Sequence, residues 1–374
     1  MKKVAVLGAT GSIGKSSLDV LRHGDFQPVL FTAHTNQDLL LKLKEEFPTA
    51  LLALSGEENA PMGIDYSGRQ GLFDAISSCK ADIFINGISG AAGLEPSIAA
   101  LNSGASLALA NKESIVMAAS LILALGKERI IPADSEHSAI FFLIKAHGRE
   151  NIEEIILTAS GGPFRNYSLE RLSKVTPKEA LDHPTYKMGP KISVDSATLA
   201  NKGLEVIEAA RFFEFPPEKI RVLIHPQSIV HSMLRLKDGS VYSQMSKPDM
   251  RLPIHSALHW PEIKPSSIGA LNEALDFNGL SLDFDNPDTS RFPMLSLAYE
   301  ACREGPLYPV AYNAANETAV DAFLEGRISF LEIPRIVEYV LSKGFWSINH
   351  EPDLCEILEA DKMARNMAFD LIGR

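Results

Sequence analysis

Short runs of branched apolar residues alternate with amphipathic stretches over the first 133 residues. The pattern predicts strands at 3–7, 28–33, 50–54, 83–86, 107–110 and 130–133, separated by helices that include 38–46 and 94–102. Strands that alternate with helices form a parallel, doubly wound sheet, and ligands bind at the carboxyl ends of its strands. An α/β, Rossmann-like N-terminal domain is therefore expected over residues 1–133.

The pattern changes twice in the rest of the chain. A helix is expected at 138–146, strands at 154–159, 220–224, 230–236 and 241–245, and a helix at 251–259. The third and fourth of these strands flank Lys237-Asp-Gly-Ser240, a hairpin signal. We therefore expect a central α/β catalytic domain over 134–260.

Prolines and short polar runs over 261–288 indicate a linker between domains. Helical periods at 313–325, 333–342 and 353–371 then predict a C-terminal helical bundle over 289–374. Within the central domain, the polar segment 165–191 carries an apolar tip with Tyr186 and Met188. This is typical of a flap that closes over a ligand.

Composition narrows the range of partners. With 36 basic and 47 acidic residues, the net charge of −11 disfavours a nucleic-acid partner, which requires a basic face. Cys79, Cys302 and Cys355 lie far apart without CxxC spacing, so neither a disulfide framework nor a zinc site is indicated. The longest apolar run, 114–126, has the length of a buried helix and not of a membrane span. The apolar run near the start is too short for a signal peptide, so a cytoplasmic location is expected.

A glycine-rich turn, Gly8-Ala-Thr-Gly11-Ser-Ile-Gly14, joins the first strand to the first helix. This arrangement allows backbone N–H groups to meet a pyrophosphate, although the spacing is GxxGxxG and not GxGxxG. The alternative is a tight turn without a ligand. The second strand ends in His34-Thr35-Asn36, with no acid to bind a ribose 2′-hydroxyl, which favours NADP(H) over NAD(H).

Two polar motifs follow strands of the predicted sheet. They are Ala110-Asn-Lys-Glu113 and Asp134-Ser-Glu136-His137. In an extended segment the Asp134 and Glu136 carboxylates face one way, and they repel each other unless a cation lies between them. The alternatives are a cap role for Asn111 and a helix N-cap role for Asp134.

A third cluster lies between Ser196 and Glu205, where a hydroxyl, an amide, an ammonium and a carboxylate fall within ten residues. The pattern predicts a helix with Ser196 as its N-cap, and with Asn201 and Glu205 on one face beside Lys202. The first three groups suit a phosphate, and the carboxylate suits a metal. The alternative is a solvated helix face with one ion pair. Similarly, the Ser160-Gly-Gly loop either holds an oxyanion or only turns the chain.

The chain carries the following motifs in this order: Gly8-Ala-Thr-Gly-Ser-Ile-Gly14, Ala110-Asn-Lys-Glu113, Asp134-Ser-Glu136, Ser160-Gly-Gly-Pro-Phe164, His183-Pro184, Ser196 to Glu205 and Pro248-Asp-Met-Arg251. As an ordered set, they resemble the 1-deoxy-D-xylulose 5-phosphate reductoisomerase family over essentially the full length of the chain. Two departures are that family members often carry a small or basic residue at His34-Thr35, and that many carry Trp at Tyr186.

The resemblance implies an activity. The family isomerises 1-deoxy-D-xylulose 5-phosphate by carbon–carbon bond migration and reduces the resulting aldehyde with NADPH. The product, 2-C-methyl-D-erythritol 4-phosphate, leads to isoprenoid precursors. The resemblance also implies a divalent cation, Mg²⁺ or Mn²⁺, and a homodimer.

The same resemblance assigns residue roles. Catalysis falls to Lys112, Asp134, Glu136, His183 and Glu205, of which Asp134, Glu136 and Glu205 bind the metal. The sugar phosphate substrate contacts Lys112, Ser135, Glu136, Ser160, His183, Ser196, Asn201, Lys202 and Glu205. NADPH contacts Thr10, Gly11, Ser12, Ile13, Ala33, His34, Thr35, Asn36, Asn111, Glu113 and Gly189.

Two other classes of protein share the nucleotide-binding pattern. A semialdehyde dehydrogenase needs a reactive cysteine, but none of the three lies in a glycine-rich loop or beside a histidine. A non-enzymatic cofactor sensor would have no use for the acidic and phosphate-binding residues beyond residue 130.

Overall fold

The computed structural model describes residues 1–59, 61–182, 188–271 and 273–373, which form two compact units. The first unit comprises 1–114, 122–138 and 249–276, and the second comprises 115–121, 139–248 and 277–374. Helices α5 (Lys112–Ala124) and α6 (Ser135–His147) contribute residues to both units. The domain limits inferred from the sequence stay a prediction.

The first unit is built on a seven-stranded sheet with the order β4-β3-β2-β1-β5-β6-β7. Its strands are β1 (Lys2–Leu7), β2 (Phe26–Ala33), β3 (Leu51–Leu54), β4 (Tyr66–Ser67), β5 (Ile83–Asn86), β6 (Ser106–Leu109) and β7 (Ile130–Pro132). Neighbouring strands pair in parallel, and the strand order reverses at β1. This confirms the doubly wound sheet and places a ligand-binding switch point at the carboxyl ends of β1 and β5.

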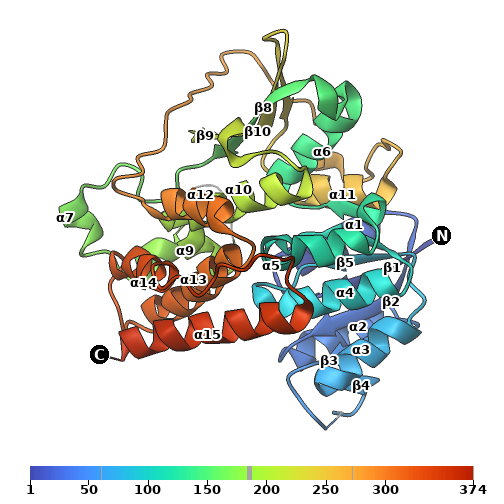
Figure 1. Cartoon of the computed structure of the whole chain (residues 1–374). Helices are drawn as coiled ribbons and strands as arrows, with labels where there is room; N and C mark the ends of the chain where they lie inside the picture. The colour runs from blue at the N-terminus through green and yellow to red at the C-terminus, as the bar shows by residue number, and fades with distance from the viewer. Residues whose placement is uncertain (60, 183–187, 272, 374) are drawn as a thin grey trace. The chain divides into compact units, whose positions relative to one another are not determined.

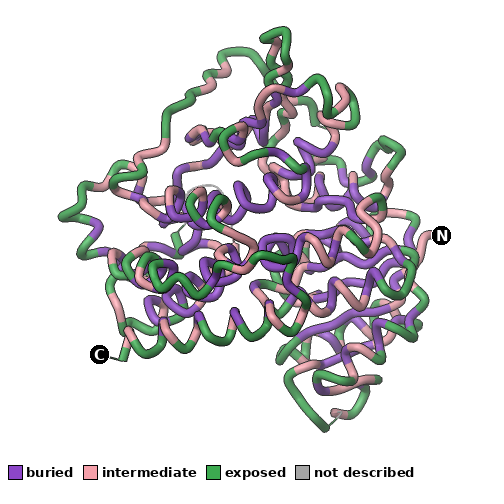
Figure 2. The backbone as a smooth tube through the Cα atoms, viewed as in Figure 1, coloured by how far each residue is buried: buried purple, intermediate pink, exposed green. Residues whose placement is uncertain are grey.

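Burial explains why these strands read as continuous apolar runs. The residues of β5 are all buried, and β1 and β6 are buried beyond their first one or two positions (Figure 2). Parallel strands are covered on both faces, so alternation between apolar and polar positions is lost. Helices α2 (Gln37–Glu46) and α3 (Gly68–Ser78) pack against β3 at one edge of the sheet (Figure 1).

The other helices of the first unit are α1 (Ser12–His23), α4 (Leu94–Asn102) and α11 (Arg251–His259). Its 3₁₀ turns are η1 (Ala91–Gly93), η2 (Lys127–Arg129) and η5 (Gly269–Leu271). Helix α11 comes from far along the chain and packs on α1, where Arg251 Nη1 donates to Asp19 Oδ2 at 2.6 Å. The Pro248-Asp-Met-Arg251 motif therefore anchors the return of the chain to the first unit.

The second unit contains a four-stranded sheet with the order β11-β10-β8-β9. The strands are β8 (Ile152–Ala159), β9 (Ile220–Ile224), β10 (Val230–Leu236) and β11 (Val241–Met245). Strands β8 and β9 are parallel, and the other two pairs are antiparallel. The predicted β10–β11 hairpin is confirmed, with Gly239 in its turn at φ 89°.

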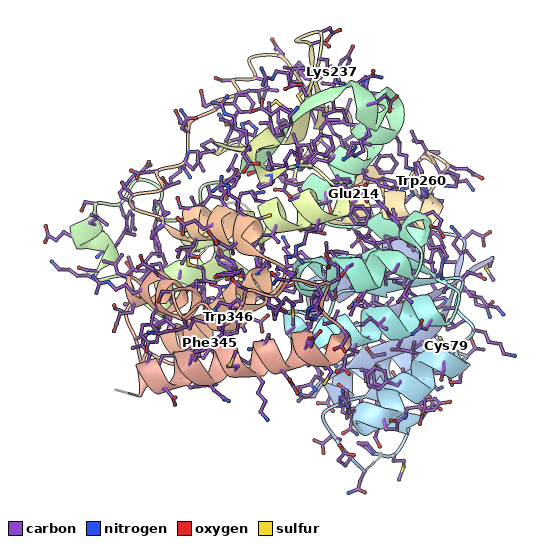
Figure 3. All side chains as sticks on the ribbon, viewed as in Figure 1. Cys79, Glu214, Lys237, Trp260, Phe345 and Trp346 are labelled. Atoms are coloured by element: carbon purple, nitrogen blue, oxygen red, sulfur yellow. The ribbon has the colours of Figure 1, made fainter. Side chains whose placement is uncertain are left out.

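Helix α13 forms the centre of the helical part of this unit. The helices are α7 (Leu169–Leu172), α8 (Pro177–Leu181), α9 (Pro190–Thr198), α10 (Ala200–Phe212), α12 (Met294–Glu304), α13 (Tyr308–Leu324), α14 (Glu332–Leu341) and α15 (Leu354–Ile372), with 3₁₀ turns η3 (Arg149–Asn151) and η4 (Pro217–Lys219). Five buried alanines allow α12, α14 and α15 to approach α13 closely (Figure 1). After α14, the fully buried Trp346 donates its Nε1 hydrogen to Val340 O at 3.0 Å, next to the exposed Phe345 (Figure 3). The predicted C-terminal bundle is confirmed.

Candidate functional site

The glycine-rich turn has the close backbone packing that the sequence suggested. Gly8 lies at φ 79°, and its N–H donates to Thr32 Oγ1 at 3.0 Å. A Cβ on Gly14 would lie 2.3 Å from the Ala9 carbonyl, so only glycine fits there. Gly11 is the N-cap of α1. The turn thus presents a helix N-terminus at the switch point, which suits a pyrophosphate.

The residues after β2 are engaged in local contacts. His34 Nδ1 lies 3.1 Å from Ser55 Oγ. Asn36 is the N-cap of α2, where its Oδ1 accepts from Leu39 N at 3.1 Å. Ala33 is buried, and Thr35 is exposed. Of the residues that are predicted here to contact the cofactor, Asn36 also caps a helix, a structural role that the sequence did not predict.

Asn111 acts as the cap that was considered as an alternative. Its Oδ1 accepts from Ser114 N at 3.0 Å, at the start of α5. Its Nδ2 donates to Ile88 O at 2.8 Å and Gly90 O at 2.9 Å, and also reaches Glu113 Oε2 at 3.0 Å. The amide joins the loops that follow β5 and β6, so it shapes this edge of the sheet.

The buried Lys112 and the half-buried Asp134 form an ion pair after β6 and β7. Lys112 Nζ lies 2.7 Å from Asp134 Oδ2. The His137 ring, which is fully buried, places Nδ1 3.9 Å from Asp134 Oδ1. Burial alone would raise the pKa of Asp134, but the Lys112 ammonium and the His137 ring hold it well below its usual range. The Asp134 carboxylate is therefore negatively charged at neutral pH.

One part of the sequence reading is wrong here. Ser135 and Glu136 lie in the first turn of α6 and not in an extended segment. Asp134 caps this turn, because its Oδ1 accepts from Glu136 N at 3.3 Å, and Ser135 Oγ donates to Glu136 Oε2 at 2.5 Å. The helix also places His137, three residues after Asp134, beside the Asp134 carboxylate. The sequence did not predict a role for His137, although helical spacing would have indicated it.

In the second unit, the Ser160-Gly-Gly loop lies against the end of α9. Gly161 and Gly162 have φ values of 82° and 69°, and Ser160 Oγ accepts from Gly162 N at 3.2 Å. A Cβ on Gly162 would lie 2.6 Å from Ser196 O. Because Gly162 has no Cβ, the loop that contains Ser160 packs closely against the backbone of Ser196.

The single helix predicted after Ser196 is instead two helices, and Ser196 is not an N-cap. Ser196 lies within α9, and Leu199 adopts the left-handed conformation at φ 63°. Helix α10 begins directly after it, with Thr198 Oγ1 accepting from Ala200 N at 3.2 Å. A left-handed leucine is strained, and such strain occurs preferentially at binding sites.

Asn201, Lys202 and Glu205 meet on the first turns of α10. Asn201 Nδ2 donates to Glu205 Oε1 at 2.6 Å, and the Lys202 ammonium pairs with Glu205 Oε2. Lys202 and Glu205 are 3% and 1% exposed. The alternative of a solvated helix face is wrong, because these charges are buried.

The predicted site residues divide between the units. The first unit holds Thr10, Gly11, Ser12, Ile13, Ala33, His34, Thr35, Asn36, Asn111, Lys112, Glu113, Asp134, Ser135 and Glu136, and the second holds Ser160, Gly189, Ser196, Asn201, Lys202 and Glu205. Gly189 is the N-cap of α9. His183 and Tyr186 lie outside the described residues, whereas Met188 is half-buried. In the described ranges, no helix is long and apolar enough to cross a membrane.

Comparison with known proteins covers almost the whole chain. Three family models match: 1-deoxy-D-xylulose 5-phosphate reductoisomerase at residues 4–119, its C-terminal domain at 130–213, and the DXP reductoisomerase C-terminal domain at 245–367. The 1-deoxy-D-xylulose 5-phosphate reductoisomerase of Treponema denticola is 46% identical, with 98% of this chain and 96% of that protein covered. The protein of the same name from Geotalea uraniireducens is 45% identical, with 100% and 99% covered.

Solved structures agree with the sequence comparison. A DOX-P reductoisomerase in complex with NADPH, fosmidomycin and magnesium has a TM-score of 0.92 and 37% identity, with 100% of this chain and 98% of that chain covered. The Zymomonas mobilis 1-deoxy-D-xylulose 5-phosphate reductoisomerase in complex with NADPH has a TM-score of 0.86 and 40% identity, with 99% of each chain covered.

Proposed function

The chain belongs to the 1-deoxy-D-xylulose 5-phosphate reductoisomerase family, and on this premise we propose how its residues share the reaction. Its activity is the NADPH- and divalent-metal-dependent conversion of 1-deoxy-D-xylulose 5-phosphate into 2-C-methyl-D-erythritol 4-phosphate, for isoprenoid precursor synthesis. The observation that carries the assignment of residues is the Lys112–Asp134 ion pair, which keeps a carboxylate charged at the edge of a nucleotide-binding sheet.

We assign the metal to Asp134, Glu136 and Glu205. Their oxygens suit Mg²⁺ or Mn²⁺, and the low pKa of Asp134 supports the fit because a ligand must be deprotonated. When bound, the cation stabilises negative charge that develops on substrate oxygens. Lys112 then has two tasks: it neutralises Asp134, and it donates a hydrogen bond to a hydroxyl of the substrate.

The substrate phosphate is assigned to Ser160, Ser196, Asn201 and Lys202, with His183 and Ser135 as further substrate contacts. Packing of the glycine loop on the backbone of Ser196 supports this assignment, since it brings the segment that contains Ser160 close to the segment that contains Ser196. Asn201 and Lys202 already donate to one anionic group, Glu205, so both present donors suited to an anion.

NADPH is assigned to the glycine turn, Thr10 to Ile13, and to the residues that follow β2 and β6. Gly189 joins them from the start of α9. The helix N-terminus at Gly11 supports the position of the pyrophosphate.

A homodimer is supported by the edge of the smaller sheet. Strand β11 is an edge strand, and Val241, Tyr242 and Met245 expose 52%, 43% and 38% of their surface. An unpaired apolar edge is a template for pairing with a second copy. We propose a cytoplasmic homodimer without a nucleic-acid partner.

Oxidation of NADPH, followed by its absorbance with 1-deoxy-D-xylulose 5-phosphate as substrate, tests the function. EDTA should abolish the rate, and Mg²⁺ or Mn²⁺ in excess should restore it. A rate that survives EDTA but is lost on thiol alkylation would favour a cysteine-dependent dehydrogenase. The cysteines speak against that outcome: burial raises the pKa of Cys79 and Cys302, and the Glu359 carboxylate raises that of Cys355.

A further inference from the structure

Helix α13 contacts both helices that flank the break at Leu199. On one side of the break, Asn316 Nδ2 donates to Asp195 Oδ1 of α9 at 2.8 Å. On the other side, the Tyr312 hydroxyl lies 2.7 Å from the position that a Cβ on Gly203 of α10 would occupy. One helix face thus touches α9 and α10 on opposite sides of the strained leucine.

Asp195 directly precedes Ser196, which makes its anchoring important for the phosphate. The carboxylate is 1% exposed, and its second oxygen lies 2.9 Å from Lys191 Nζ, one turn earlier. Burial, together with the negative charge of Asp195, raises the pKa of Tyr312 well above its usual value, so the tyrosine stays neutral. The Asp195 carboxylate thus accepts a hydrogen bond from the Asn316 amide and forms an ion pair with the Lys191 ammonium.

The hydrogen bond between Asn316 and Asp195 contributes little to the free energy of folding. Buried ion pairs and amides are often replaceable by apolar residues of similar volume without loss of stability. In addition, Asn316 Oδ1 is buried and has no hydrogen-bond partner within the part of the chain that is described, which costs free energy. The pair is therefore better explained by the fixed orientation that it gives to α9.

We infer that Asn316 and Asp195 are positioning residues for the substrate phosphate: they hold α9 so that Ser196 faces the same anion as Asn201 and Lys202 across the left-handed turn. This deepens the proposed function and rests on its phosphate site. Neither residue touches substrate or cofactor in this scheme. Their effect reaches the ligand only through the orientation of α9.

Asn316→Leu tests the inference, with Asn313→Leu as a matched control. Both asparagines are fully buried on α13, and each has an amide oxygen without a partner among the described residues, but Asn313 donates to Glu317 and Met117 and not to Asp195. Two quantities are measured: the affinity for inorganic phosphate by titration calorimetry, and KM and kcat for both substrates.

Asn316→Leu should weaken phosphate binding and raise KM for the sugar phosphate by about tenfold, since ligand donors move out of register. The kcat should stay within about twofold, because the phosphate contacts are common to the ground state and the transition state. The KM for NADPH should also stay within about twofold, because the substitution acts on the phosphate site. Asn313→Leu should change none of these values by more than about twofold.

Asp195→Asn removes the charge at the other end of the contact and should reproduce the KM effect. If circular dichroism shows that Asn316→Leu is unfolded, Asp195→Asn alone tests whether the pair positions the phosphate-binding residues. Unchanged phosphate affinity and KM in the folded variants would overturn the inference, as would an equal rise in KM with Asn313→Leu. A wild-type protein that binds phosphate but does not turn over the sugar phosphate would instead refute the proposed function, and the phosphate titrations would still decide the inference.

Discussion

Replacing Lys202 by methionine removes an ammonium that is buried against Glu205. The two residues are 3% and 1% exposed, so Glu205 would remain as a charge in a low-dielectric environment without the Lys202 ammonium to balance it. Removing one member of a buried pair typically costs about 3–5 kcal/mol of folding free energy. Lys202→Met should therefore lower the free energy of unfolding by that amount, as measured by urea denaturation in the absence of divalent metal.

Adding Glu205→Gln to this variant should recover most of the lost stability, because the uncompensated charge is then gone. The kinetic effects should separate in the single variants. Lys202→Met should raise KM for the sugar phosphate by about one to two powers of ten, with a smaller loss in kcat, since it removes the phosphate contact that we propose for Lys202, worth about 1.5–3 kcal/mol. Glu205→Gln should lower kcat by about a hundredfold and raise the metal concentration required.

Two results would refute this reasoning. If the double variant is no more stable than Lys202→Met, burial of the Glu205 charge is not the cause of the loss. If Glu205→Gln keeps its kcat and its metal dependence, Glu205 is not a metal ligand. The wild-type protein, measured with and without Mg²⁺, is the reference for both assays.

Two further predictions concern the cofactor and the response to acid. The absence of an acid at His34-Thr35-Asn36 predicts that kcat/KM is about tenfold to a hundredfold higher with NADPH than with NADH, and equal efficiencies would contradict it. Burial, with His259 nearby, lowers the pKa of His255 from 6.5 to about 4. The unfolded chain therefore takes up the proton first, so this histidine contributes stability above pH 6.5 that is lost as the pH falls towards 4. His255→Gln should show a smaller drop in thermal midpoint between pH 7 and pH 5 than the wild type, on the order of a few degrees, and an identical drop would exclude His255 as the cause.

Much of the fold is encoded locally and could be predicted from the sequence. The strands of the larger sheet are short, branched and buried on both faces, and they alternate with helices, so their periodicity identifies them. Among the described strands of this sheet, the two-residue β4 is the one that the periodicity does not predict. The glycine turn is equally local, because its chemistry depends on positive φ at Gly8 and on the absence of a Cβ at Gly14.

Other features depended on contacts between distant parts of the chain. The sequence placed Ser196 at a helix start, but the helix breaks at Leu199 instead, where α13 and the glycine loop pack against α9. Helical spacing predicted that Asn201, Lys202 and Glu205 share a face, yet it could not say that the face is buried, since burial depends on which element covers it. The Asp195–Asn316 bond joins residues 121 positions apart, and no local pattern specifies such a pair. Local sequence therefore determined which residue types are available for the chemistry, whereas tertiary packing decided which of them are buried, paired and aimed at one another.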